Sequence, residues 1–193
     1  MAEAAVVGSS LSSSEPEPVN AVSIPAYEII PDTADHTAGV EALYDVVFGP
    51  GRFAKTAERL REGNTKIAEA SFVAVDAEGV TGAVRVWPVT IGGKARAAFL
   101  GPIAVAERRR GNGVAFKLME RAIGVCREQG YSAVILVGDQ EYYERFGFKQ
   151  AGAGRFLLPG PVDQHRILIR DLSPGAAKLK GELSVPRAAR PAS

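Results

Sequence analysis

The feature that most constrains this sequence is an apolar run that leads into a basic, glycine-containing turn. Residues 97–105 have the length and composition of a buried strand, and a helical pattern opens near Gly113. Between them stand Arg108-Arg109-Arg110 and Gly111. The first N–H groups of a helix lack partners within the helix and carry partial positive charge, and glycines let an anion approach them closely. The sequence therefore predicts a cradle for a phosphate or pyrophosphate group.

Two familiar phosphate-binding loops do not fit this turn. A Walker loop requires Gly-Lys-Ser or Gly-Lys-Thr, and neither occurs in the chain. A dinucleotide fingerprint requires a third glycine at the position that Phe116 occupies, and an acidic residue after the next strand. Neither motif matches, so the turn belongs to another type of anion site.

The turn resembles the R/Q-x-x-G-x-G/A motif of the GNAT superfamily of N-acyltransferases, written here as Arg108-x-x-Gly111-x-Gly113. Downstream, residues 132–137 form a second apolar strand pattern, and the following segment ends in Tyr-x-x-x-Gly-Phe at Phe148, similar to the family's second signature. Together these segments resemble the YhbS-like branch of the superfamily. A weaker resemblance extends over residues 27–172, which is most of the chain.

The resemblance implies an α/β (α+β) GNAT fold, in which a mixed central sheet is flanked by helices and a splayed pair of strands holds coenzyme A. The residue patterns agree with the family's order β-α-α-β-β-β-α-β-α-β-β. Strands are expected at 27–31, 69–75, 82–89, 97–105, 132–137 and 166–169. Helices are expected after a cap at Asp32, Thr33 or Asp35, at 53–61, at 113–128 and from Asp139 through Tyr143. The first of these helices is expected to bury Val40, Leu43, Val46 and Val47, and Gly130 is expected to cap the third.

The chain divides into three expected parts. Residues 1–25, rich in Ala, Ser and Pro without a period, indicate a disordered N-terminal extension. Residues 26–172 form the expected GNAT domain, and residues 173–193 form a basic, proline-containing C-terminal tail. An alternative for the last part is an extended segment packed on the domain, because Leu179, Leu183 and Val185 are apolar.

Charge and composition limit the partners. The first 51 residues contain eight acids and no Lys or Arg, whereas the remainder has 23 basic and 14 acidic residues, a net charge of +9. This basic part suits an anionic ligand, but it has no basic stripe interleaved with aromatics, so we expect no nucleic acid partner. No apolar run reaches the ~20 residues that span a bilayer. The absence of Lys and Arg near the start of the sequence argues against a secretory signal or a mitochondrial presequence. We therefore expect a cytoplasmic protein with no membrane partner; a homodimer is compatible with the sequence.

The resemblance implies acetyl-CoA as the co-substrate, with no metal. One cysteine and two histidines offer little material for a metal site or a disulfide framework. The expected pyrophosphate contacts are Arg110, Gly111, Asn112, Gly113, Val114 and Ala115. The expected pantetheine contacts are Ile103, Ala104 and Val105, because a strand edge can pair with the amides of pantetheine as another strand would.

Tyr143 is the expected catalytic residue. By resemblance it lies near the thioester sulfur and donates a hydrogen bond or a proton to the departing thiolate. The alternative is that Tyr143 only packs beside the cofactor. Tyr142 is expected to point elsewhere, into the core or onto the surface.

No general base can be assigned from the sequence. Asp139 stands nearest the expected slot, but capping of the following helix is the favoured role for its side chain. Glu69 and Glu141 are weaker candidates, and His36 and His165 are expected to be ordinary surface or loop residues. Cys126 lies on the buried stripe of a helix, which argues against a cysteine nucleophile.

These observations favour an acyltransferase that moves an acetyl group from acetyl-CoA to a primary amine by direct attack in a ternary complex. The acceptor, a small molecule or a protein amine, is not identified by any motif. The alternative is a non-catalytic sensor that binds coenzyme A and regulates a partner.

Overall fold

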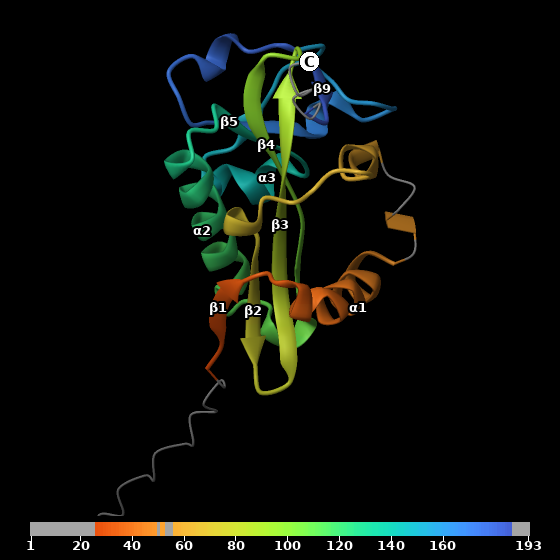
Figure 1. The fold of residues 1–193 in the computed structure, drawn as a ribbon, viewed down its shortest axis with the longest axis vertical. Coiled ribbons are helices and arrows are strands. Elements are labelled where there is room, and N and C mark those ends of the chain that lie inside the picture. Colours follow the sequence, from red (N-terminus) through yellow and green to blue (C-terminus); the bar gives the residue numbers. More distant parts are fainter. Residues whose placement is uncertain (1–25, 50, 53–55, 187–193) are drawn as a thin grey trace, which may run out of the picture.

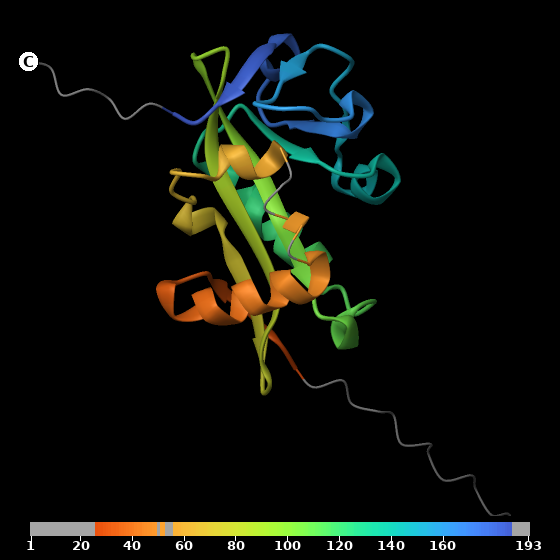
Figure 2. The same cartoon turned by 90° about the vertical axis from the view of Figure 1, so that its right-hand side faces the viewer.

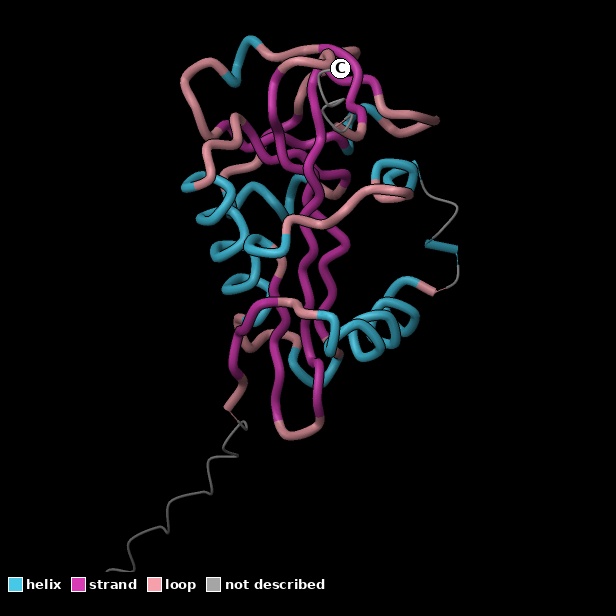
Figure 3. The backbone as a smooth tube through the Cα atoms, viewed as in Figure 1, coloured by secondary structure: helices cyan, strands magenta, loops and turns pink. Residues whose placement is uncertain are grey.

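The computed structural model describes residues 26–49, 51–52 and 56–186, and its centre is one twisted sheet (Figures 1 and 3). The strands are β1 (Glu28–Pro31), β2 (Phe72–Asp76), β3 (Gly79–Ile91), β4 (Ala95–Val105), β5 (Ala133–Val137), β6 (Lys149–Gln150), β7 (Phe156–Leu157), β8 (Ile167–Asp171) and β9 (Gly181–Ser184). Their order is β1-β2-β3-β4-β5-β8-β6, and β9 pairs with β3 and β7. The β4–β5 pair is parallel, and its neighbours in this path are antiparallel. The expected mixed sheet is confirmed.

Two helices cover opposite faces of the sheet, α1 (Thr37–Phe48) and α2 (Val114–Glu128), and a short helix α3 (Gln140–Tyr143) follows β5 (Figures 1 and 2). The side chains of successive strand residues alternate between the two faces. Val73 accordingly packs in the α1 core, and its neighbour Ala74 packs in the α2 core. This alternation places the sheet between the two helices as the middle layer.

The helix α2 forms as the sequence predicts and lies very close to the sheet. Leu118, Met119, Ala122 and Cys126 on its apolar stripe are fully buried. The first turn of the helix packs directly on β3 at Gly82, where an added Cβ would lie 2.7 Å from Val114 Cγ1. A glycine at this position therefore fixes how deeply the first turn of α2 sits, and the turn before that helix with it. Gly130, with φ of 74°, follows the helix as expected for a C-cap.

Three expectations about local elements are corrected by the structure. Val46 was expected in the core but is 85% exposed, because the buried face of α1 passes through Tyr44 instead. The expected helix at 53–61 is a 3₁₀ helix over Thr56–Leu60, and residues 53–55 lie outside the described ranges. Glu69 belongs to a 3₁₀ turn, Ala68–Ala70, so β2 begins only at Phe72.

The segment after β8 packs on the domain, so the alternative to a solvated tail describes residues 173–186. The strand β9 pairs with β3 at Thr90 and Ile91, and Leu183 and Ala176 are completely buried. The scattered apolar residues of this segment fill one end of the core. Residues 1–25, which we expect to be disordered, and residues 187–193 of the tail lie outside the described ranges.

Among the described helices, none has the length and apolar character that crossing a bilayer requires.

Candidate active site

The strands β4 and β5 diverge in the middle of the sheet. They pair only at Ala98 with Val134 and at Phe99 with Ile135, yet β4 continues to Val105. Beyond Phe99, β4 keeps its pairing with β3 on one side only. The edge of β4 that faces β5 is therefore open from Leu100 onward, as expected for a splayed strand pair.

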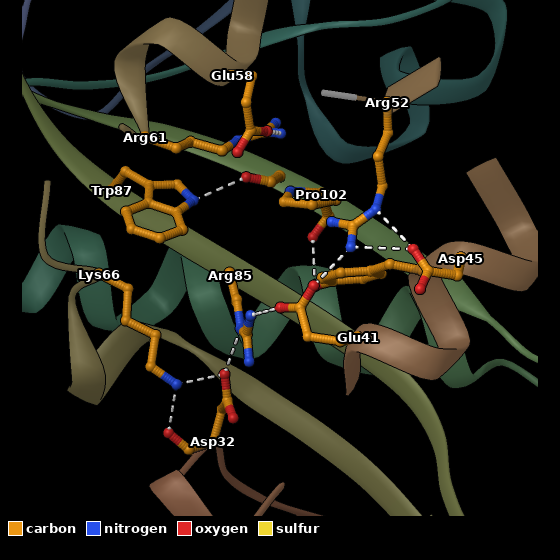
Figure 4. A network of polar contacts seen from close by, with 12 residues as sticks. Asp32, Glu41, Asp45, Arg52, Glu58, Arg61, Lys66, Arg85, Trp87 and Pro102 are labelled. Atoms are coloured by element: carbon orange, nitrogen blue, oxygen red, sulfur yellow. Dashed lines mark hydrogen bonds and ion pairs between the residues drawn. The ribbon is translucent and has the colours of Figure 1, made fainter. Parts of the chain in front are cut away.

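A β-bulge bends β4 where this divergence begins. Gly101 and Pro102 together oppose the single residue Arg85 of β3. Their carbonyl oxygens are held by side chains, because Trp87 Nε1 donates to Gly101 O at 3.0 Å and the Tyr44 hydroxyl donates to Pro102 O at 3.0 Å (Figure 4). Bulges next to active sites re-aim a strand. Here the bulge directs the last residues of β4 away from β5.

The first of two adjoining cavities lies along the open end of β4 and the start of α2. Its volume is about 530 Å³. Its walls include every expected coenzyme A contact except Asn112, namely Ile103, Ala104, Val105, Arg110, Gly111, Gly113, Val114 and Ala115. The Asn112 carbonyl instead accepts a hydrogen bond from the Tyr27 hydroxyl at 3.3 Å. Strand edge and glycine turn therefore line one continuous hollow, which we call the cradle.

The floor of the cradle is a group of free backbone donors. The N–H groups of Gly111, Gly113, Val114 and Ala115 donate no backbone hydrogen bond within the part of the chain that the structure describes. They lie where the helix dipole of α2 is positive. Gly111 and Gly113 have φ of 80° and 74°, so glycine is also required here by backbone conformation, and an added Cβ at either would project into open space. This arrangement can bind a pyrophosphate.

The three adjacent arginines have different roles. Arg108 Nη1 and Arg109 Nε donate to the Asp76 carboxylate at 2.5 and 2.8 Å. The hydrogen bonds from Arg108 and Arg109 outweigh the effect of desolvation and hold the pKa of Asp76 well below its ordinary value. Both Arg109 and Arg110 line the cradle, but Arg109 is buried and Arg110 is exposed. Arg108 and Arg109 therefore fasten the turn to the end of β2, and Arg110 is the arginine placed to meet an anion.

A second cavity of about 440 Å³ lies on the other side of the bulge. Apolar side chains from five regions of the chain form most of its walls: Phe48, Ala57, Phe99, Leu100, Pro102, Ile103, Leu136, Val137, Pro161 and Val162. Its charged walls are Arg52, Arg61, Asp163 and Arg166. We call it the acceptor cavity, after the acceptor amine that is expected from the sequence.

Tyr143 and Ile103 lie in the walls of both cavities. Tyr143 is the last residue of α3, and its ring packs edge-on against Tyr142 and Phe148, with centroids 4.9 and 6.1 Å away. Desolvation raises the pKa of Tyr143 to about 12. The hydroxyl is therefore protonated at neutral pH and can donate its proton or a hydrogen bond there.

Gly138 gives the Tyr143 ring its position. An added Cβ at Gly138 would lie 2.3 Å from Cε2 of Tyr143, closer than real Cβ atoms approach another heavy atom. The ring thus rests against the bare backbone at the end of β5. No motif in the sequence marked this contact, although glycine directly after a buried strand is a signal that could have been read.

A network of ion pairs holds α1 and Arg52 against the sheet (Figure 4). Arg85 of β3 donates to Asp32 at 2.7 Å and to Glu41 at 2.6 Å, and Arg52 donates to Glu41 at 2.6 Å and to Asp45 at 3.1 Å. Burial raises the pKa of Glu41, but the hydrogen bonds from the two arginines outweigh it and keep this pKa below its ordinary value. The network fixes one wall of the acceptor cavity.

None of the base candidates from the sequence lines either cavity. Asp139 occupies the N-cap position of α3, but its side chain makes no capping bond; it turns outward to Arg166 Nε at 3.3 Å. His36 accepts a hydrogen bond from the Thr33 backbone N–H, and His165 is exposed. Glu69 and Glu141 are exposed, and neither is among the lining residues of the two cavities.

The carboxylate that does line the acceptor cavity is Asp163, which sequence reasoning missed. It is exposed, and one of its oxygens accepts a hydrogen bond from the His165 backbone N–H at 2.9 Å. Cys126 is fully buried, and burial raises the pKa of its thiol to about 12, so this thiol is structural. Within the described ranges, no three His, Cys, Asp or Glu side chains cluster closely enough to hold a metal ion.

Comparison with known proteins gives one consistent result. Residues 39–148 match the model of the acetyltransferase (GNAT) family. The chain is 36% identical over 115 residues to an uncharacterized N-acetyltransferase, YhbS, of Escherichia coli K12, covering 58% of this chain and 68% of that protein.

Two solved structures are similar over most of their length. One is the E. coli GNAT family N-acetyltransferase YhbS in complex with CoA, with a TM-score of 0.72 and 27% identity over 89% of this chain and 93% of that one. The other is a GNAT family acetyltransferase from Brucella melitensis in complex with acetyl-CoA, with a TM-score of 0.61 and 25% identity over 82% and 95%. With its splayed strands, its glycine cradle and this family match, the chain belongs to the acetyltransferase (GNAT) family.

Proposed function

We propose that this N-acetyltransferase moves an acetyl group from acetyl-CoA to a primary amine by direct attack, with both substrates bound at once. The observation that carries the proposal is the position of Tyr143 in the walls of both cavities. A thioester in the cradle and an amine in the acceptor cavity would meet beside this one hydroxyl. The similar E. coli and B. melitensis structures, which are complexes with CoA and acetyl-CoA, support the choice of co-substrate.

The cradle supplies the contacts that coenzyme A requires. Its pyrophosphate would accept hydrogen bonds from the N–H groups between Gly111 and Ala115 and an ion pair from Arg110. Its pantetheine amides would pair with the open edge of β4 at Ile103, Ala104 and Val105. These contacts are made mostly by backbone, so they hold the thioester in one register against the bulge.

The transfer itself consists of one bond made and one broken. The neutral amine attacks the thioester carbonyl, the new C–N bond forms, the C–S bond breaks, and coenzyme A leaves as a thiolate while the surplus amine proton passes to water. Tyr143 has a pKa of about 12, and a thiol has one of about 8.5, so complete proton transfer from the phenol would be uphill by roughly 5 kcal/mol. The Tyr143 hydroxyl therefore acts by donating a hydrogen bond to the developing thiolate, which takes its proton from water.

Turnover of acetyl-CoA against a broad panel of amines, with mass detection of the acetylated product, tests the proposal. We expect at least one primary amine to gain an acetyl group at a rate well above that of thioester hydrolysis. Tight acetyl-CoA binding without transfer to any amine of the panel would instead favour the coenzyme A sensor.

A further inference from the structure

The acceptor cavity contains a buried guanidinium with an unused hydrogen-bonding edge. Arg61 follows the 3₁₀ helix Thr56–Leu60, and 13% of its side chain is exposed. Its Nη1 donates to Glu58 at 2.9 Å, whereas its Nε is buried and has no partner among the described residues. Nε and Nη2 form the side of the guanidinium that matches a carboxylate with two parallel hydrogen bonds. Glu58 thus leaves that side free.

The free side of Arg61 reaches the place where the substrates would meet. A Cβ built on Gly101 would lie 3.7 Å from Arg61 Nη2 and 3.9 Å from the backbone nitrogen of Ile103. The Arg61 guanidinium is therefore close both to the bulge and to the strand edge that would hold the thioester. Its guanidinium also lies 5.9 Å from the centre of the Phe99 ring, which helps to fix its position.

The charged groups around Arg61 do not fully compensate its positive charge, so a bound anion would be favourable. Burial lowers the pKa of Arg61 in spite of its ion pair with Glu58, which means that its positive charge is incompletely compensated. Arg52 and Arg166 face the same cavity, but Arg52 is bound to Glu41 and Asp45, and Arg166 to Asp139. Arg61 combines burial with an unpaired Nε and an Nη2 close to the bulge, and a buried polar group of this kind normally has a partner.

We propose that the acceptor is an amino acid: a small molecule whose primary amine is acetylated while its carboxylate binds the guanidinium of Arg61. This inference rests on the proposed function and names its substrate class. Asp163, in the same wall, is placed to receive the ammonium form of the arriving amine. The apolar walls from Phe48, Phe99 and Val162 suit an aliphatic or aromatic side chain. A cavity of about 440 Å³ fits a single amino acid rather than a folded protein surface.

A panel of matched acceptors tests the carboxylate directly. Leucine, phenylalanine and methionine are each compared with their primary amides and with the corresponding decarboxylated amines, at saturating acetyl-CoA. Charged hydrogen bonds in a buried site predict that kcat/KM for the amino acid exceeds that for its amide by about tenfold to a hundredfold. Equal rates for acids and amides across the panel, or a preference for peptides with amidated C-termini, would overturn the inference.

Substitution of Arg61 gives the second arm. Arg61→Met keeps the apolar stem but removes the guanidinium, so the amino acid should lose about tenfold or more through a higher KM, while the amide changes little. Arg61→Lys keeps the charge without the double hydrogen bond and should be intermediate. The matched control is Arg59→Met on the same 3₁₀ helix, because Arg59 is exposed and donates to the Pro159 carbonyl. An equal loss for acid and amide in Arg61→Met would contradict the assignment.

Two further measurements separate the inference from the proposed function and from misfolding. The double variant Arg61→Met with Glu58→Gln removes both charges of the pair, so a folding defect caused by an unpaired Glu58 is avoided. Calorimetric binding of N-acetylphenylalanine and its amide to the protein with bound CoA reports carboxylate recognition without turnover. Failure to acetylate any amine would remove the proposed function. Failure of the N-acetyl acid to bind more tightly than its amide, in a protein that acetylates amines, would remove only the inference.

Discussion

The cradle and the acceptor cavity meet at Tyr143 but are built in different ways. The cradle is formed by backbone N–H groups of consecutive residues, Gly111 to Ala115, and by one strand edge. The acceptor cavity is formed by side chains from separate segments, so that Arg61 and Arg166 come to the same hollow from 105 positions apart. Backbone donors bind any ligand with the right phosphate geometry, whereas side chains decide which amine fits. In the proposed function the first region binds the co-substrate, and the second selects the acceptor.

The rate should depend on pH only through the protonation of the acceptor amine. This is the largest effect that we expect. An amine with a pKa near ~10.4 gains about tenfold in free base per pH unit. Between pH 6 and 9, kcat/KM for such an amine should therefore rise by about a thousandfold. The pKa of Tyr143, raised to about 12, keeps its hydroxyl protonated throughout, so no falling limb should appear below about that pH. Initial rates over this range, with constant KM for acetyl-CoA, check this. A plateau near pH 7 would reveal a base on the enzyme.

Removing the Tyr143 hydroxyl should lower kcat without changing the affinity of the cradle for acetyl-CoA. Tyr143→Phe keeps the ring and its packing, so we expect kcat to fall by about a hundredfold, the low end for acid assistance, because water can also protonate the thiolate. Acetyl-CoA affinity by calorimetry should change little. Tyr142→Phe is the matched control, because that neighbouring ring is more exposed, and we expect its kcat to stay within about twofold. Full kcat in Tyr143→Phe would make Tyr143 a packing residue.

A carboxylate introduced into the cradle should instead lower the affinity for acetyl-CoA. Gly113→Asp places negative charge against the pyrophosphate and adds a side chain at a positive φ, so acetyl-CoA affinity should fall by at least about thirtyfold, or ~2 kcal/mol. The measurement is calorimetry on a variant whose folding is verified by circular dichroism. Unchanged affinity in a folded variant would remove Gly113 from the binding surface.

The smallest effect should come from a substitution of Gly138, the residue against which the Tyr143 ring packs. In Gly138→Ala the new Cβ would overlap the Tyr143 ring, while the backbone of Gly138, which has no positive φ, accepts alanine. The ring must tilt, so we expect kcat to fall by about tenfold with little change in acetyl-CoA affinity. Gly124→Ala in α2 is the control, because its Cβ would meet nothing within 4 Å. A loss of activity equal in both variants would show a general folding effect instead.

The fold class and the cradle could be predicted from the sequence, because both depend on the local order of residues. A buried strand, a glycine turn and a helix start are adjacent in the chain, and the free N–H groups follow from the turn and the helix alone. The stripe of α2 and its end near Gly130 were readable for the same reason. Family resemblance added Tyr143, which the structure places in the walls of both cavities.

The tertiary structure decided what local patterns leave open. Val46 fits the apolar spacing of α1 as well as Tyr44 does, and only packing on β3 and β4 selects which one is buried. The strand β9 has no period that predicts a strand, and it forms because β3 offers a partner at Thr90 and Ile91. The unpaired Nε of Arg61 and the carboxylate of Asp163 come to one cavity from segments far apart in the chain. Their positions follow from long-range packing, which a one-dimensional pattern does not contain.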